Sequence, residues 1–177
     1  MFASDVHGSA YYCRKMLDAY KEEKAERLVL LGDLLYHGPR NDLPREYAPK
    51  QVISMLNDMK KEIYAVRGNC EAEVDQMVLQ FPVMADYCIL NLDGRTFYAT
   101  HGHIYNENNL PPIQEGDILI HGHTHVLKAE QKEGYVLLNP GSVSIPKEGN
   151  PPTYVIFEDG VFTIKDFEGN IVKSIEL

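Results

Sequence analysis

The first half of the chain alternates between short apolar runs and longer amphipathic segments. Three segments repeat apolar residues at helical spacing: residues 9–26, 52–59 and 74–81. A short apolar run precedes each of them: residues 1–4, 28–31 and 63–66. Apolar residues at i, i+3, i+4 and i+7 predict amphipathic helices, and short apolar runs predict buried strands. The resulting β-α-β-α-β-α order predicts a largely parallel sheet with helices packed against it.

Beyond residue 82 the pattern changes to a series of short strands. They are predicted at 87–92, 95–100, 117–121, 126–132, 135–139, 153–157, 161–166 and 170–176. Three of the connections are hairpin signals: Asp93-Gly94, Glu133-Gly134 and Asp159-Gly160. No linker separates the two halves, so we expect one α/β domain spanning residues 1–177.

Composition narrows the class of protein. With 177 residues, 44% hydrophobic and 24% charged, the chain matches an ordinary globular domain that buries one core. Its net charge of −9 disfavours a nucleic-acid-binding surface, which is usually basic. We expect no membrane segment and no signal peptide. Cys13, Cys70 and Cys88 form no C-x-x-C pair, which predicts free thiols and a cytoplasmic location.

Side chains that bind metals follow five of the predicted strands. They are Asp5 with His7, Asp33, Asn69, His101, and His123 with His125. In open α/β sheets the ligand crevice lies beyond the carboxyl ends of the strands. One Asp or Asn at such a place is explained by turn preference, but five strand ends together predict a metal site. Carboxylate, amide and imidazole donors suit Mn²⁺, Fe²⁺ or Zn²⁺ better than Ca²⁺.

The stretch Ile120–His125, IHGHTH, places three of the seven histidines at alternate positions. Alternate side chains of a strand share one face, so we expect His121, His123 and His125 to point the same way at the end of a strand. H-x-H alone is a weak metal signal. The motif indicates a metal site only because candidate ligands also follow the other strands.

The ordered motifs D-x-H, GD, GN, HG and GHTH resemble those of the calcineurin-like metallophosphoesterases, as do GDLLYHGPRN, RGNCE and NPGSVSIP. The resemblance implies a β-sandwich of two mixed sheets flanked by helices. It implies that Asp5, His7 and His125 hold one divalent metal, and that Asn69, His101 and His123 hold a second. Asp33 would bridge the two. Mn²⁺ is the expected metal, with Fe²⁺, Zn²⁺, Ni²⁺ or Co²⁺ as alternatives.

The implied reaction is hydrolysis of a phosphodiester by a hydroxide that bridges the two metals. The resemblance gives catalytic roles to Asp33, Asn69, Cys70 and His101. The loop after Asp33 carries His37, Arg40 and Asn41, and His37, Arg40 and Cys70 are the candidates for substrate binding. Arg40 and Asn41 either contact a substrate phosphate or lie in a solvated loop.

Cys70 departs from the family pattern. Many relatives read G-N-H-[DE] at this place and use the histidine as general acid, whereas this chain reads Gly68-Asn-Cys-Glu71. Cys70 is either an active-site group suited to particular diesters or a small residue that leaves room for a larger ester. A thiol is a weak hydrogen-bond donor, so we expect weak catalysis on poor leaving groups.

Other polar residues have open roles. His121 precedes the G-H-x-H motif and is expected to be a structural, hydrogen-bonded histidine. His103 is a candidate to support a ligand. Asn139-Pro-Gly-Ser142 is either a turn beside the site or simply a turn.

The sequence favours a phosphodiesterase acting on a small substrate. The alternatives are a nucleotide or dinucleoside polyphosphate hydrolase, and a non-catalytic protein-binding scaffold of the same fold. A scaffold is disfavoured because every expected ligand position is filled. Self-association is common in the family, so we expect a homo-oligomer.

Overall fold

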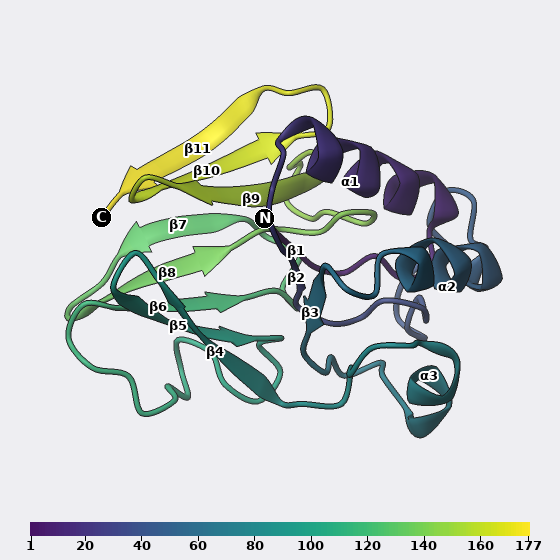
Figure 1. Cartoon of the computed structure of the whole chain (residues 1–177), viewed down its shortest axis with the longest axis horizontal. Coiled ribbons are helices and arrows are strands. Elements are labelled where there is room, and N and C mark those ends of the chain that lie inside the picture. Colours follow the sequence, from purple (N-terminus) through teal and green to yellow (C-terminus); the bar gives the residue numbers. More distant parts are fainter.

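The computed structural model describes all 177 residues and contains eleven strands and three helices (Figure 1). The first half comprises β1 (Phe2–Ala3), α1 (Ala10–Glu22), β2 (Leu28–Leu30), α2 (Pro49–Asp58), β3 (Ile63–Ala65) and α3 (Glu73–Val78). The second half comprises β4 (Tyr87–Leu92), β5 (Arg95–Thr100), β6 (Asp117–His121), β7 (Lys128–Gln131), β8 (Tyr135–Asn139), β9 (Thr153–Glu158), β10 (Val161–Asp166) and β11 (Ile171–Glu176). The predicted order of elements is confirmed.

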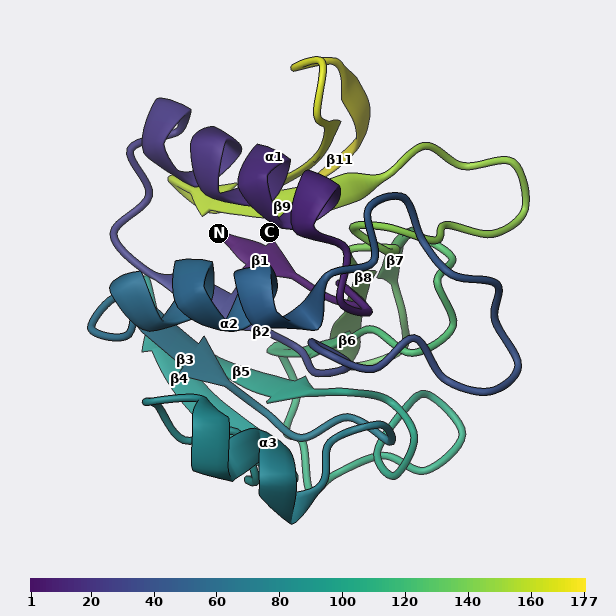
Figure 2. The same ribbon diagram turned by 90° about the vertical axis from the view of Figure 1, so that its right-hand side faces the viewer.

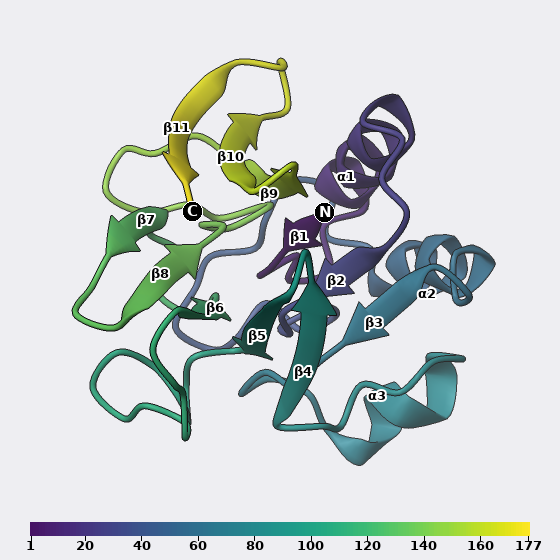
Figure 3. The same cartoon turned by 60° about the vertical axis from the view of Figure 1, so that its left-hand side comes forward.

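The strands form two facing mixed sheets, which appear as two arcs in Figure 3. The six-stranded sheet has the order β11-β10-β9-β1-β2-β3, and the five-stranded sheet has the order β4-β5-β6-β8-β7. β1, β2 and β3 are parallel, as are β5, β6 and β8. The β-sandwich is therefore the predicted one.

The main cores lie between the sheets and beneath the helices. Phe2 and Phe162 of one sheet pack against Phe97 of the other, with ring centroids 6.1 and 5.6 Å from that of Phe97. The apolar faces of α1 and α2 cover the six-stranded sheet, and the two helices lie side by side (Figure 2). Ser9 caps α1 by accepting a hydrogen bond from the Tyr12 N–H. None of the three helices has the length and apolar character needed to cross a bilayer.

The third helix differs from its prediction. It ends at Val78, and its apolar side chains at Val74, Met77 and Val78 are exposed by 60%, 83% and 38%. The prediction that the apolar face of this helix packs against the core is therefore wrong. The chain leaves the helix at Leu79 (φ −89°, ψ 129°), and Leu79, Phe81 and Val83 of the segment that follows are buried in the core instead.

Candidate metal centre

The loops that follow β1, β2, β3, β5 and β6 meet at one end of the sandwich. They bring together all seven predicted ligands: Asp5, His7, Asp33, Asn69, His101, His123 and His125. Parallel strands point their carboxyl ends to the same edge of a sheet, and here both sheets contribute.

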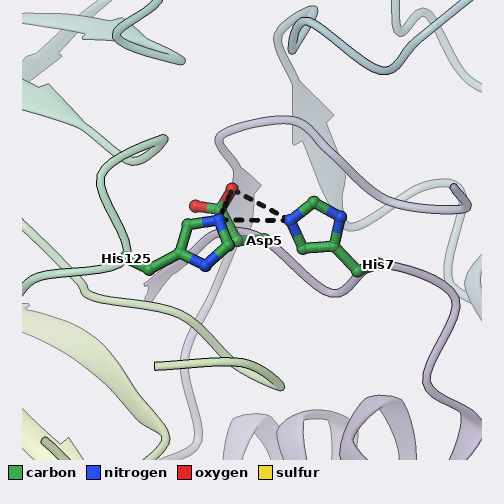
Figure 4. Close-up of side chains that lie close together, drawn as sticks. All are labelled: Asp5, His7 and His125. Atoms are coloured by element: carbon green, nitrogen blue, oxygen red, sulfur yellow. Dashed lines mark hydrogen bonds and ion pairs between the residues drawn. The ribbon is translucent and has the colours of Figure 1, made fainter. Parts of the chain in front are cut away.

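The first group consists of Asp5, His7 and His125 (Figure 4). His7 Nε2 lies 3.2 Å from His125 Nε2, and Asp5 Oδ1 lies 3.5 and 3.2 Å from these two nitrogens. Both rings are held from behind, because His7 Nδ1 lies 2.7 Å from the Tyr36 carbonyl and His125 Nδ1 lies 2.8 Å from the Ile145 carbonyl. A carbonyl only accepts, so each Nδ1 carries the proton and each Nε2 directs a lone pair inward.

This geometry fits a divalent cation. Asp5 is fully buried, and its Oδ1 has no hydrogen-bond partner in the protein. An ionised oxygen and two imidazole lone pairs that converge on one point repel each other unless a positive charge lies among them.

The second group consists of Asn69, His101 and His123. His101 Nε2 lies 3.1 Å from Asn69 Oδ1 and 3.2 Å from His123 Nδ1, and its Nδ1 donates to the Leu31 carbonyl at 2.7 Å. Burial and the neighbouring His101 lower the pKa of His123 to about 4. His123 is therefore neutral at pH 7 and can offer a lone pair.

Asp33 lies between the two groups. Its Oδ2 is 3.7 Å from His7 Nε2 and its Oδ1 is 3.5 Å from His101 Nε2, and the side chain is almost fully buried. The Cys70 N–H donates to Asp33 Oδ1 at 2.9 Å, which fixes the carboxylate plane. One carboxylate thus faces both sets of donors.

The backbone is strained at this site. Five of the seven residues have positive φ angles: Asp5 60°, His7 50°, Asp33 56°, His123 68° and His125 61°. Left-handed conformations are uncommon for residues with a Cβ, and those observed cluster at functional sites. The adjacent glycines allow close approach, since a Cβ on Gly68 would clash with Asp33 Oδ1 and one on Gly122 would clash with Ser4 and Asp5.

The structure corrects the expectation for IHGHTH. Strand β6 ends at His121, and His123 and His125 lie in the following loop, so the three histidines do not share a strand face. His121 is fully buried and bonds Glu107 through Nε2 at 2.8 Å. Its structural role is confirmed. His103 lies beside His101, with ring centroids 5.3 Å apart.

The Asn139–Ser142 turn holds two ligand-bearing loops together. Asn139 Nδ2 donates to the Gly122 carbonyl at 2.9 Å and to Thr124 Oγ1 at 3.0 Å. Ser142 Oγ and Ser144 Oγ donate to the Asp5 carbonyl at 2.9 and 3.0 Å. The turn is therefore part of the support beneath the site.

Glu71 is a supporting residue to which sequence analysis assigned no role. Its buried carboxylate accepts hydrogen bonds from three backbone N–H groups: Asp33 at 2.8 Å, Leu34 at 2.7 Å and Gly68 at 2.5 Å. It thereby ties the loop after β2 to the loop after β3. The only sequence signal was its place in Gly68-Asn-Cys-Glu71.

A polar pocket opens onto these groups. It is lined by His7, Asp33, Gly38, Pro39, Arg40, Asn41, Asn69, Cys70, His123, Thr124, His125 and Lys147. Arg40 and Cys70 line this pocket, and their contact with substrate stays a prediction. The His37 ring packs between Tyr36 and Tyr47, with centroids 4.7 and 5.3 Å away, and does not line the pocket. Lys147 was not expected, because no role was assigned to the residue that follows the family-like stretch NPGSVSIP.

Comparison with known proteins agrees with this geometry. Residues 1–159 match the family model described as the calcineurin-like phosphoesterase superfamily domain. Phosphodiesterase YfcE of Escherichia coli (strain K12) is 46% identical over 164 residues, which cover 93% of this chain and 89% of that protein. Phosphodiesterase MJ0936 of Methanocaldococcus jannaschii is 24% identical over 146 residues, which cover 78% and 80%.

Solved structures show the same fold. The structure of the E. coli phosphoesterase Yfce matches with a TM-score of 0.97 and 43% identity, covering 99% of this chain and 97% of that one. Vacuolar protein sorting 29 of Cryptosporidium parvum matches with a TM-score of 0.65 and 18% identity, covering 99% and 96%. The second likeness concerns the fold alone. From the domain match and the YfcE relationship, this chain belongs to the calcineurin-like phosphoesterase superfamily.

Proposed function

We propose that the protein is a phosphodiesterase that works with two divalent cations. The observation that carries the proposal is the Asp33 carboxylate, which faces His7 with one oxygen and His101 with the other, at 3.7 and 3.5 Å. A carboxylate shared by two donor sets is the arrangement expected of a bridging ligand. The reaction is inferred from the family and from the 46% identity to a phosphodiesterase.

Each donor set is assigned one cation. Asp5, His7 and His125 would hold the first, Asn69, His101 and His123 would hold the second, and Asp33 would contribute to both. Mixed oxygen and imidazole donors suit Mn²⁺, which we propose first, and Fe²⁺, Zn²⁺, Ni²⁺ or Co²⁺ as alternatives. When bound, such a pair supplies a hydroxide nucleophile at neutral pH and neutralises charge on the phosphoryl group.

The chain's own residues prepare the site for that chemistry. The backbone carbonyls behind His7, His101 and His125 each accept a hydrogen bond from Nδ1, which leaves Nε2 of each ring directed inward. His101 is fully buried and acts only by holding the second cation, whereas Asn69 lines the pocket and orients the phosphate.

We assign the leaving-group side of the reaction to Cys70. It lines the pocket beside Asp33, and burial together with the Asp33 charge raises the pKa of its thiol. A protonated thiol donates only weak hydrogen bonds. We therefore propose that the enzyme cleaves diesters with acidic leaving groups and handles phosphomonoesters poorly.

Two alternative functions are separated by experiment. Nucleotides or dinucleoside polyphosphates would be cleaved by the same chemistry. The second alternative is a non-catalytic scaffold of the same fold, but a scaffold has no need of seven converging donors. The three free cysteines support the proposed cytoplasmic location. The exposed apolar side chains of α3 support the proposed homo-oligomer, and size-exclusion chromatography would test it.

The test is hydrolysis of bis-p-nitrophenyl phosphate beside p-nitrophenyl phosphate, with each metal added to chelator-treated protein. We expect metal-dependent turnover of the diester and little turnover of the monoester. A folded protein that binds the metals and turns over neither compound would contradict the proposal and favour the scaffold.

A further inference from the structure

Two cationic side chains stand at the mouth of the polar pocket without a partner in the protein. Arg40 and Lys147 both line the pocket, and both are exposed. The ion pairs formed by lysine and arginine lie elsewhere, at Arg14, Lys15, Lys128, Lys132 and Lys165. Most of the 17 lysines and arginines form no ion pair, so Arg40 and Lys147 are distinguished by their position in the lining of this pocket.

The Arg40 side of the mouth is fixed by a tight turn. The Asn41 N–H donates to the Gly38 carbonyl at 3.2 Å, and Asn41 Nδ2 donates to the His37 carbonyl at 2.8 Å. Pro39 and Arg40 occupy the two central positions of this turn, and proline is favoured at the first of them. Gly38 lies against Cys70, where an added Cβ would be 3.6 Å from the thiol sulfur. The turn that carries Arg40 thus packs against Cys70 through Gly38, and Arg40 and Cys70 line the same pocket.

The Lys147 side of the mouth is fixed to a proposed metal ligand. The Lys147 N–H donates to the His125 carbonyl at 3.0 Å. The Lys147 carbonyl accepts from the Asn150 N–H at 3.2 Å and from Asn150 Nδ2 at 2.9 Å. The backbone of Lys147 therefore keeps a set position relative to the centre, although its side chain is exposed.

The pocket wall offers little to an apolar or aromatic group. Among the lining residues there is no Phe, Tyr, Leu, Ile, Val or Met. Nucleobases are usually held by stacking on aromatic side chains, and acyl chains need apolar surface. The wall instead presents cations and hydrogen-bond donors, which suit an anion.

We propose that the substrate is a phosphodiester whose alcohol portion carries a second anionic group, a carboxylate or a further phosphate, bound by Arg40 and Lys147. This inference rests on the proposed phosphodiesterase function and defines its substrate class. The two divalent metal ions would hold the phosphoryl group that reacts. Arg40 offers a planar fork of N–H donors, and Lys147 a mobile ammonium, to the second anion.

The test uses three diesters that share phosphorus chemistry and leaving group: ethyl, 2-carboxyethyl and 2-aminoethyl p-nitrophenyl phosphate. We measure kcat/KM with Mn²⁺ at fixed ionic strength. The carboxyethyl diester is expected to exceed the ethyl diester by about tenfold, because each partly exposed charge pair gives only a several-fold gain. The aminoethyl diester is expected to be slowest. The preference should shrink with added salt, since the Debye length is about 8 Å at 0.15 M.

Arg40→Gln and Lys147→Gln test the residues directly. Each should lower kcat/KM for the carboxyethyl diester several-fold more than for the ethyl diester, mainly through KM. Lys61→Gln makes the same charge change at an exposed lysine outside the pocket and should leave the ratio unaltered.

Each contrary outcome has a distinct meaning. Equal kcat/KM for the three diesters, or variants that slow all three equally, would overturn the substrate class and leave the phosphodiesterase function standing. No turnover of any diester by metal-loaded, folded protein would overturn the proposed function together with this inference.

Discussion

Glu71 offers the sharpest test of how the fold supports the centre. Its carboxylate accepts from the backbone N–H groups of Asp33 and Gly68 through Oε2 and from that of Leu34 through Oε1. Glu71→Gln keeps the size of the side chain but turns one oxygen into an NH₂ group. The new amide can take two orientations. In the better one its oxygen still accepts the hydrogen bonds from the Asp33 and Gly68 N–H groups, and its NH₂ group faces the Leu34 N–H, so that two donors oppose each other.

The magnitude follows from that geometry. A hydrogen bond to a charged group contributes about 1.5–3 kcal/mol, and a buried donor left without a partner costs a similar amount. We therefore expect Glu71→Gln to lower the free energy of unfolding by about 2–4 kcal/mol. For a chain of this size 1 kcal/mol corresponds to about 2–4 °C, so Tm should fall by at least about 4 °C.

The assay is thermal unfolding of metal-free protein, followed by calorimetric titration with Mn²⁺. Metal affinity should also fall, because Glu71 holds the backbone of Asp33. The matched control is Glu26→Gln. Glu26 is exposed, its side chain forms no ion pair or hydrogen bond, and it does not line the polar pocket at the metal centre. If Glu71→Gln melts within about 1 °C of the wild type, as the control should, the carboxylate does not hold the two loops and the reasoning fails.

Three further predictions concern the centre and its surroundings. Asp33→Asn should reduce the bound metal measured by elemental analysis and abolish diester turnover, because the bridge loses its charge; full activity would contradict a dinuclear mechanism. Cys70→His should raise the rate on p-nitrophenyl phosphate, because an imidazolium is a better acid than a thiol, and an unchanged rate would show that Cys70 does not set the restriction. Glu107 has its pKa lowered to about 2, because Lys128 and His121 outweigh burial; its contribution to stability is therefore present above pH 4.5 and lost as the pH falls toward 2. The Tm difference between wild type and Glu107→Gln should narrow over that range, and a difference independent of pH would contradict the ion-pair account.

The elements that could be predicted from the sequence are those whose pattern is set by local geometry. Helix α2 begins at Pro49, and β4 and β5 begin and end where the turn signals place them. Helix α1 ends at Glu22 rather than at residue 26, and Lys24 adopts a left-handed conformation with φ 52°. In α3, helical spacing described the apolar residues correctly but not their environment, since nothing packs over Val74 and Met77. Whether an apolar face is covered depends on tertiary packing, which spacing cannot express.

The predicted ligands meet because strand ends in a parallel arrangement must lie together, and the sequence shows which residues follow each strand. No comparable rule predicts which residues support the ligands. Glu71 and Lys147 act through backbone contacts with residues far along the chain, such as Asp33 and His125. His37 shows the opposite error, since its place in a site loop suggested substrate contact, whereas its ring packs between two tyrosines.

The left-handed residues explain why turn chemistry and metal chemistry coincide in this sequence. A residue with a Cβ in a sparsely populated backbone region costs about 1–3 kcal/mol, and five ligand positions have this conformation. Asp, Asn and His tolerate it better than most residues, and they are also the side chains that bind borderline divalent metals. A cation that binds only the folded state stabilises it by about 2.7 kcal/mol at a hundred times its Kd, which offsets part of the strain. A single Asp or His at a turn therefore carries little information. What identifies a centre is five such residues, in the loops after β1, β2 and β6, together with lone pairs that converge, as those of Asp5, His7 and His125 do.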